Sequence, residues 1–403
     1  MTDTMCVAPF VHSHVTTKYK RKLCAVAKPI EGMDKTQTAE YWNSDYVKQV
    51  RLDMLAGKTI SDCDFCYNCE KHGTESLRQK INPLYSMEEF ISKMEADGSM
   101  TIPPSYFDYR TLTCNLQCAT CDSDHSSSHI VIERDMFGKN SLHKVDNEYE
   151  QNLGNEIIQG LRNKTVKIIY WSGGEPMLMG SHWNVIEEME RLYDDPIYHD
   201  YITNIPVFYN TNITTLYWRQ RLIPEILSKF NVTIWASIDG VEETFEYCRD
   251  GAKWEQVKTN WFIYKQYIDR TYIAATLSAP VLMDIERFLD FFSDNNQTYN
   301  FSHQYEQNNY KNFLDIRLYP QQLFDDIIDN ATQKIQNIEM GGKDHTISIL
   351  EMYRKQKQEF TNVDYAPIKN EIQRRDKFLK NSHSFEALLN KIHKPTYDWY
   401  VGI

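Results

Sequence analysis

Three cysteines stand within eight residues of the segment RTLTCNLQCATCDSDHSSS, where Cys114, Cys118 and Cys121 have the spacing C-x3-C-x2-C. Thiolates hold zinc or iron–sulfur clusters, and a cluster usually takes four of them. Three ligands in one loop leave one iron of a [4Fe–4S] cluster open, as in metal sites that bind a substrate or cofactor. The alternative is a zinc site that takes a distant fourth ligand, such as His125 or His129.

The other six cysteines divide into five near the N-terminus and one in the middle of the chain. An odd total of nine, clustered in this way, favours metal binding or redox chemistry over a disulfide framework. Cys248 falls in a predicted helix and is expected to be a small buried hydrophobic residue. The N-terminal set comprises Cys6, Cys24, Cys63, Cys66 and Cys69.

The segments around the cysteine loop predict strands that alternate with helices. Strand patterns run through residues 106–114, 166–176, 205–212, 232–240 and 274–281, and a sixth, less regular pattern lies at 313–320. This alternation implies parallel βα units, and we expect an α/β fold, a partial (β/α)6 TIM-type barrel over residues 100–320. In such a barrel the loops after the strands carry the function.

Two regions flank the predicted barrel. In residues 1–85, the strand patterns CVAPFVHSHVTT and KLCAVA are joined by the turn YKRK and followed by a helix that Gly57 ends. The predicted hairpin carries two cysteines and the helix is followed by a C-x2-C pair, so four ligands come from two ends of one small domain. Residues 321–403 are polar and predict helices, which we expect to close the open side of the barrel.

Three further motifs follow the predicted strands. Glycines let the backbone approach a ligand closely, and carboxylates, amides and guanidinium groups recognise its polar parts. The motifs are Gly173-Gly174-Glu175-Pro176, Asn210-Thr211-Asn212, and Ser237-Ile238-Asp239-Gly240 with Arg249 shortly after it.

The cysteine loop and these motifs together resemble the radical S-adenosylmethionine (SAM) superfamily. The resemblance implies that the three cysteines hold a [4Fe–4S] cluster, whose open iron is chelated by SAM. One electron then splits SAM into methionine and a 5′-deoxyadenosyl radical, which abstracts a hydrogen atom from the substrate. It further implies that Glu175 receives the SAM ammonium group, and that the asparagine motif contacts the ribose. Ser237, Asp239 and Arg249 correspond to the family's contacts to the ribose and carboxylate of SAM.

Three positions depart from the family pattern. Thr120 stands before the third cysteine, where the family commonly has a large residue, so Tyr109 or Trp171 is expected to pack on the adenine instead. Asn212 replaces the usual glycine, and asparagine tolerates the left-handed backbone region. Tyr19 stands near the place of the usual hairpin glycine in the N-terminal region.

The run CDFCYNCEKHGTESLR resembles that of twitch-type radical SAM proteins, the shorter relatives of SPASM proteins, although their module usually follows the barrel. This resemblance implies an auxiliary [4Fe–4S] cluster on Cys6, Cys24, Cys63 and Cys66, with Cys69 in reserve. The cluster would accept an electron or shape the substrate site. A structural zinc ribbon is the alternative, and zinc moves no electrons.

The net charge of −12 over 403 residues argues against a broad nucleic-acid surface. With no apolar run of about 18 residues and no secretory signal pattern, we expect a cytoplasmic protein without a membrane segment. The predicted enzyme is an oxidoreductase or maturase that takes electrons from a donor such as flavodoxin or ferredoxin and acts on a peptide or protein side chain. The alternatives are a dehydrogenase or epimerase of a small metabolite, sugar or nucleotide, and a non-catalytic metal-stabilised scaffold.

Overall fold

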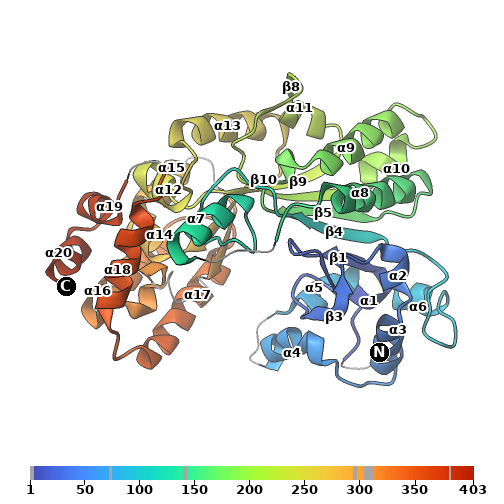
Figure 1. Ribbon diagram of the computed structural model, residues 1–403, viewed down its shortest axis with the longest axis horizontal. Helices are drawn as coiled ribbons and strands as arrows, with labels where there is room; N and C mark the ends of the chain where they lie inside the picture. Colours follow the sequence, from blue (N-terminus) through green and yellow to red (C-terminus); the bar gives the residue numbers. More distant parts are fainter. Residues whose placement is uncertain (1–3, 72–74, 139–142, 294–296, 304–312, 381–382) are drawn as a thin grey trace. The chain divides into compact units, whose positions relative to one another are not determined.

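The computed structural model describes residues 4–71, 75–138, 143–293, 297–303, 313–380 and 383–403, and the chain divides into two compact units (Figure 1). The first unit comprises Met1–Thr113, His143–Tyr209 and Lys229–Val232, and the second comprises Cys114–Leu142, Asn210–Ser228 and Thr233–Ile403. Neither unit is a continuous segment, because the chain passes between them after residues 113, 142, 209, 228 and 232. These contact-based units cut across the regions 1–85, 100–320 and 321–403, which stay a prediction from sequence pattern.

The first unit is built on a mostly parallel sheet. Neighbouring strands follow the order β6-β5-β4-β1-β2-β3, in which the pairs β6–β5, β5–β4 and β4–β1 are parallel and the pairs β1–β2 and β2–β3 are antiparallel. The mixed α/β class predicted from sequence is therefore confirmed. The strands are β1 (His12–Val15), β2 (Lys20–Lys22), β3 (Pro29–Asp34), β4 (Tyr106–Thr111), β5 (Ile168–Gly173) and β6 (Pro206–Thr211), the last ending in the second unit.

Two long helices cover this parallel part, and α8 contacts both β4 and α9 (Figure 1). The Asp146 side chain caps α8, and Leu153, Ile157 and Leu161 recur at the helical period as its buried face. Gly154 of α8 lies directly against Ser181 of α9, where a larger residue would hold the helices apart. The helices of this unit are α1 (Ala8–Val11), α2 (Thr38–Trp42), α3 (Asp45–Leu55), α4 (Asp64–Lys71), α5 (Leu77–Ile81), α6 (Met87–Ile91), α8 (Asn147–Arg162), α9 (Gly180–Tyr193) and α10 (His199–Asn204).

The N-terminal hairpin differs from the prediction in its extent. Strand β1 begins only at His12, because the preceding residues form the short helix α1 with a proline in its first turn. Cys6 therefore precedes that helix rather than lying on a strand, and Cys24 follows the end of β2. Tyr19 does adopt the left-handed conformation, with φ of 58°. Its hydroxyl donates to Glu150, a long-range bond that offsets the cost of this backbone region.

The second unit contains a parallel set of three strands and most of the C-terminal helices. Strand β10 (Thr271–Leu277) pairs in parallel with β9 (Asn231–Ser237) and with β11 (Tyr299–His303). The small hairpin β7 (Tyr217–Trp218) and β8 (Arg221–Leu222) is separate. The helices are α7 (Ser127–Phe137), α11 (Ile223–Leu227), α12 (Glu242–Cys248), α13 (Trp254–Tyr267), α14 (Ala279–Met283), α15 (Ile285–Phe292), α16 (Gln321–Asn337), α17 (Lys343–Gln356), α18 (Tyr365–Asp376), α19 (Phe385–Ile392) and α20 (Lys394–Gly402).

The prediction of a sixth strand at residues 313–320 is wrong. This segment contains a 3₁₀ turn at Ile316–Leu318, because the Asp315 side chain accepts a hydrogen bond from the Arg317 backbone and also binds its guanidinium group. The strand that pairs with β10 is instead β11, which alternates buried and exposed side chains.

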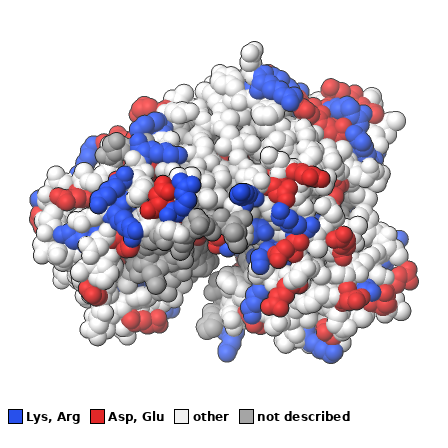
Figure 2. All heavy atoms as spheres, viewed as in Figure 1, with Lys and Arg blue, Asp and Glu red and all other residues white. Residues whose placement is uncertain are grey.

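Within the described ranges, no helix is long and apolar enough to cross a membrane. On the face that Figure 2 shows, acidic and basic side chains are interspersed, and neither forms a continuous patch.

Candidate functional site

The cysteine loop opens the second unit and is held on one side by the start of α7. Ser127 accepts a hydrogen bond from the Cys114 amide at 3.1 Å, and Ser128 donates to the Cys114 carbonyl at 2.7 Å. The Nε2 atom of buried His129 lies 3.0 Å from the Cys118 carbonyl. A carbonyl only accepts, so this nitrogen carries a proton and does not serve as a zinc ligand.

The loop is held on another side by the segment that follows α12. The Gln117 amide donates to the Asp250 carbonyl at 2.8 Å, and the Ala119 amide donates to the Cys248 carbonyl, also at 2.8 Å. The Cys248 side chain itself is fully buried, as expected for a small hydrophobic residue. Two segments far apart in sequence therefore fix the backbone between the first and third cysteines.

Arg249 joins this segment to both the loop and the end of β9. Its Nε lies 2.7 Å from Asp239 Oδ2, and its Nη1 lies 3.7 Å from the Cys118 sulfur. Although burial opposes the charged form, Asp239 and Cys118 raise the pKa of Arg249. Asp239 is itself buried, and its other oxygen accepts from the Thr276 amide at 2.8 Å. Ser237 stands half-buried at the end of β9. The guanidinium group is therefore a fixed positive charge beside Cys118.

The asparagine motif contacts the same loop. Asn212 donates from Nδ2 to Asn115 Oδ1 at 3.0 Å, and its own Oδ1 accepts from the Thr214 amide. Asn212, which would tolerate the left-handed conformation, does not adopt it, whereas the next residue, Ile213, does, with φ of 48°. A β-branched residue such as Ile213 is strained in the left-handed region. The hydrogen bonds of the Asn212 side chain with Asn115 and Thr214 hold the backbone in this conformation. Asn210 is half-buried at the end of β6.

The glycine motif lies in the first unit, directly after β5. Gly174 donates its amide to the Thr111 carbonyl, and Glu175 donates its amide to the Thr113 carbonyl, both at 2.7 Å. Gly173 has φ of 105°, and a Cβ atom at either glycine would lie less than 3.0 Å from one of these carbonyl oxygens. The motif is therefore a close backbone-to-backbone contact on the segment that leads into the cysteine loop.

Glu175 and Pro176 complete this turn. Glu175 is fully buried, and its Oε1 accepts from the Met177 amide at 3.0 Å. Pro176 starts a 3₁₀ turn, a position where its missing N–H costs nothing. The Glu175 carboxylate, which is predicted to receive an ammonium group, is thus positioned by the backbone amide of Met177.

Four of the N-terminal cysteines line one pocket in the first unit. Its volume is about 350 Å³ including the space open to solvent, and it is lined by Cys6, Cys24, Cys63 and Cys66 together with Arg78 and apolar residues. All four cysteines are buried, whereas Cys69 is half-buried and does not line the pocket. Burial raises the pKa of Cys24 to about 11 and that of Cys63 to about 12, so deprotonation in this pocket needs a nearby cation.

Neither described cysteine set has its sulfurs gathered as closely as in a zinc site. In a tetrahedral zinc site, bonds of about 2.3 Å place the sulfurs about 3.8 Å apart. Among the described residues, no three cysteines have sulfurs within 4.8 Å of one another. His125, the other histidine considered as a zinc ligand, is paired through Nδ1 with Asp122 at 2.7 Å.

Two expected adenine contacts lie in the core of the first unit. Tyr109 is buried on the α8 side of the sheet, where its hydroxyl donates to Glu156 at 2.8 Å. Trp171 is also buried and packs edge-on against His182. Neither ring is exposed to a ligand, so the prediction that one of them packs on adenine is wrong.

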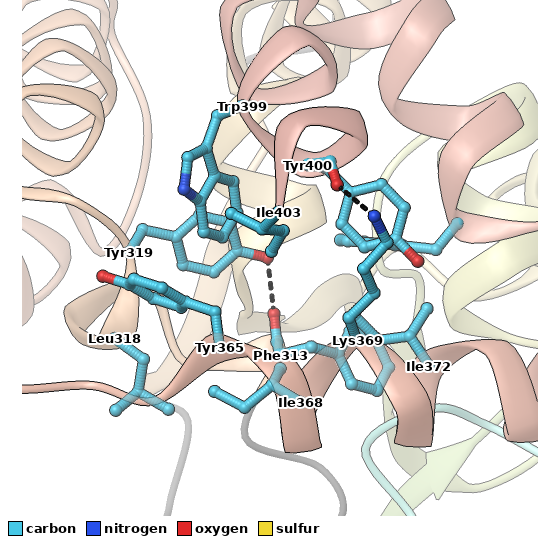
Figure 3. A pocket seen from close by; sticks show the side chains of 11 residues that line it. Phe313, Leu318, Tyr319, Tyr365, Ile368, Lys369, Ile372, Trp399, Tyr400 and Ile403 are labelled. Atoms are coloured by element: carbon cyan, nitrogen blue, oxygen red, sulfur yellow. Dashed lines mark hydrogen bonds between the residues drawn. The ribbon is translucent and has the colours of Figure 1, made fainter.

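An apolar pocket of about 300 Å³ lies among the C-terminal helices of the second unit (Figure 3). Tyr319, Tyr365 and Trp399 line it, and the Tyr319 hydroxyl donates to the Phe313 carbonyl at 2.7 Å. None of the predicted cofactor residues lines this pocket, so it is separate from the cysteine site.

The signal that sequence reasoning missed in this site is the polar run DSDHSSS after the third cysteine. Serine near a helix start commonly binds backbone groups. Ser126 donates to the Leu116 carbonyl at 3.1 Å, and Ser127 and Ser128 bind the Cys114 backbone in a similar way. The run therefore predicts a support for the cysteine loop.

No protein-family model and no curated protein matches the chain. Among solved structures, the chain is similar to native anSMEcpe with bound AdoMet, at 16% identity and a TM-score of 0.38, over 57% of this chain and 60% of that one. It is also similar to SuiB of Streptococcus suis bound to S-adenosylmethionine, at 14% identity and a TM-score of 0.40, over 75% and 61%. A third similar structure is SuiB bound to the precursor peptide SuiA, at 13% identity and a TM-score of 0.39, over 78% and 66%.

The chain spans about 60% of the length of the first of these structures. Similarity of this extent establishes neither a family nor a shared activity, so the function has to be argued from the residues of this chain.

Proposed function

We propose that this chain is a radical SAM enzyme, in which Cys114, Cys118 and Cys121 hold a [4Fe–4S] cluster with one iron open for SAM. The observation that carries this proposal is the network through Arg249, which joins Cys118 to Asp239 at the end of β9. The cluster and SAM, when bound, supply a 5′-deoxyadenosyl radical that abstracts a hydrogen atom from a substrate.

The residues of the second unit position and charge-balance this site. The bonds from α7 and from residues 248–250 hold the backbone of the loop that carries the three thiols. Burial raises the pKa of Cys118, and the guanidinium group of Arg249 opposes this by favouring the thiolate. Asp239 orients that guanidinium group, and Asn212 fixes the middle of the loop through Asn115.

In the first unit, we propose that the glycine motif gives the cofactor access to backbone groups and that Glu175 receives its ammonium group. The glycines leave no side chain between the motif and the end of β4. Burial of Glu175 strengthens an interaction with a cation, since the local dielectric constant is low.

We further propose that the pocket of Cys6, Cys24, Cys63 and Cys66 holds an auxiliary [4Fe–4S] cluster. The raised thiol pKa values make these cysteines dependent on a bound cation for their deprotonated form. Arg78, on the wall of the pocket, is held by an ion pair with Glu70 and adds positive charge beside the thiolates.

Anaerobic reconstitution of the full chain tests both clusters by iron, sulfide and zinc analysis. Two clusters give about eight irons per chain. Cys24→Ser should lower this to about four, and Cys69→Ser is the matched control that should keep about eight, because Cys69 does not line the pocket. About four irons and one zinc in the wild-type chain would contradict the auxiliary cluster.

Reduction of the same samples with SAM present tests the activity. The wild-type chain should release 5′-deoxyadenosine, and Cys114→Ala should release none while keeping about four irons. Wild-type release no higher than that of Cys114→Ala would favour the non-catalytic scaffold. A colourless, iron-free wild-type protein after anaerobic handling would overturn the radical SAM assignment.

For the substrate, we propose a peptide or protein side chain. The excess of 56 acidic over 44 basic residues favours a basic peptide over a nucleic acid. Peptides deuterated on their side chains test this, because hydrogen abstraction carries deuterium into 5′-deoxyadenosine. Transfer from a deuterated small metabolite, and from no peptide, would favour the dehydrogenase or epimerase alternative.

A further inference from the structure

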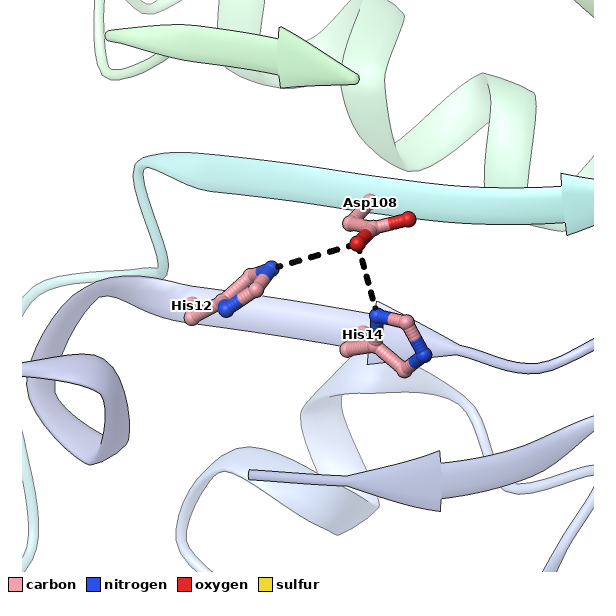
Figure 4. A group of neighbouring side chains, drawn as sticks. All are labelled: His12, His14 and Asp108. Atoms are coloured by element: carbon pink, nitrogen blue, oxygen red, sulfur yellow. Dashed lines mark ion pairs between the residues drawn. The ribbon is translucent and has the colours of Figure 1, made fainter. Parts of the chain in front are cut away.

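Two histidines and an aspartate form a compact buried group on one face of the sheet in the first unit. Figure 4 shows His12 and His14 on β1 and Asp108 on the neighbouring strand β4. His14 is directly opposite Asp108 in the parallel register, and its Nδ1 lies 2.9 Å from Asp108 Oδ2. His12 Nε2 lies 4.0 Å from the same oxygen. This is the one set of three metal-binding side chains among the described residues whose ligand atoms all lie within 4.8 Å.

Most ring nitrogens of this group lack a hydrogen-bond partner within the described part of the chain. Both histidine side chains are at most 2% exposed, and apart from His14 Nδ1 beside Asp108 their ring nitrogens make no hydrogen bond. Asp108 Oδ2 is the close neighbour of His14 Nδ1, which leaves His14 Nε2 and both ring nitrogens of His12 without a hydrogen bond. Buried polar atoms are usually satisfied, so this cluster points to a missing ligand.

We propose that His12, His14 and Asp108 bind a first-row divalent transition-metal cation, at a site separate from both cysteine sets. Two imidazoles and one carboxylate are a donor set typical of Zn²⁺ and Fe²⁺, with remaining positions open to water or another ligand. Burial keeps both imidazoles neutral at pH 7, so each offers a lone pair.

The neighbouring positive charges set the conditions for binding. Arg110 donates from Nε to Asp108 Oδ1 at 3.2 Å and from Nη2 to Oδ2, the oxygen nearest the two rings, at 3.4 Å. Its guanidinium group therefore orients the carboxylate as an outer-shell partner does. Lys22 is opposite His14 in the β1–β2 register. Both charges repel a cation, so the affinity depends on the imidazole and carboxylate ligands.

The sequence contains a signal for this site. The pattern His-x-His in a strand places both rings on one face, because side chains alternate with a period of two. Asp108 comes from a parallel pairing between segments about ninety residues apart, which no local pattern specifies. His12 stacks on Tyr106, opposite it in the register, so the ring is held in place by packing.

Zinc uptake by the reconstituted, cluster-loaded full chain tests the proposal, because the thiols are then occupied by iron. We expect one additional zinc per chain after dialysis, with X-ray absorption showing nitrogen and oxygen neighbours at about 2.0–2.1 Å. Asp108→Asn should abolish this uptake. His199→Ala is the matched control, since it removes a partly exposed histidine of the same unit outside the site and should leave uptake unchanged.

A second variant separates metal binding from a purely structural role. Lys22→Met removes a positive charge next to the rings and should raise the zinc affinity. No additional zinc in the wild-type chain, or a zinc shell of sulfur at about 2.3 Å, would overturn the proposal even if Asp108→Asn failed to fold. Zinc uptake that Lys22→Met leaves unchanged or weakens would also count against it.

Discussion

Replacing Gly174 by alanine tests the close contact between the glycine motif and the end of β4. A Cβ atom at this position would lie less than 3.0 Å from the Thr113 carbonyl oxygen, which belongs to the backbone and cannot rotate away. The motif has to move, and its movement breaks the two hydrogen bonds to Thr111 and Thr113. Gly180→Ala is the matched control, because nothing lies within 4 Å of a Cβ at that first position of α9.

The two contributions together give the expected magnitude. Two lost backbone hydrogen bonds cost about 1 kcal/mol each. Overpacking at a rigid contact adds about 1–3 kcal/mol. Gly174→Ala should therefore lower the free energy of unfolding by about 3–5 kcal/mol, which is a large part of the stability of a typical domain. Gly180→Ala should change it by less than about 1 kcal/mol, or raise it, because alanine favours a helix.

Urea unfolding of both variants under anaerobic conditions measures the difference. The reasoning predicts a clearly lower midpoint for Gly174→Ala with an unchanged slope. If the two variants differ by less than about 1 kcal/mol, the close contact at Gly174 does not exist as described. Loss of 5′-deoxyadenosine formation in Gly174→Ala, with the cluster iron retained, would additionally connect the motif to cofactor binding.

Three further predictions concern buried or paired charges. Arg249→Met should destabilise the chain by about 3–5 kcal/mol because it leaves Asp239 buried and unpaired, and a double variant with Asp239→Asn should recover part of that loss in urea unfolding. Arg191 and Arg162 lower the pKa of Glu188 from 4.5 to about 2. This shift corresponds to about 3 kcal/mol of folding stability. Solvent screening at the exposed guanidinium groups reduces that contribution to about 1–2 kcal/mol. Glu188→Gln should lower the free energy of unfolding at pH 7 by this amount. The difference from wild type should vanish as the pH falls from about 4.5 through about 2, because the ion pairs stabilise only the ionised carboxylate. Arg51→Leu should cost about 3–5 kcal/mol and lower the iron content of the N-terminal pocket first, because Arg51 donates to the carbonyl of Pro9 on the pocket wall.

The strands that carry the motifs could be predicted from sequence, because their patterns are local. Strands β5 and β9 are short runs of apolar and β-branched residues that end at glycine or polar turns. Strand β3 could not be predicted in this way, since as an exposed edge strand it lacks a buried face. The sixth strand was misplaced because Ile316 and Leu318 suggest a strand, whereas the Asp315 side chain closes a turn there.

The residues of the candidate site could be proposed from their motifs, but their contacts depend on long-range packing. Nothing near Arg249 in sequence indicates that its guanidinium group reaches Cys118, more than a hundred residues earlier. The same applies to His14 and Asp108, which come together only through the pairing of β1 with β4. That Ile213 rather than Asn212 takes the left-handed conformation after β6 is likewise not indicated by the sequence.

The interleaving of the two units has a consequence for the order in which they form during synthesis. The first unit is complete once residue 232 has been made, and it contains the N-terminal cysteine pocket. The cysteine loop belongs to the second unit, which also needs the 171 residues from 233 to 403 (403 − 232). At about 5–20 residues per second, these take roughly 9–34 s to translate. During that interval Cys114, Cys118 and Cys121 are outside the ribosome before the second unit is complete, so they are the thiols most exposed to oxygen and to the wrong metal before iron is delivered.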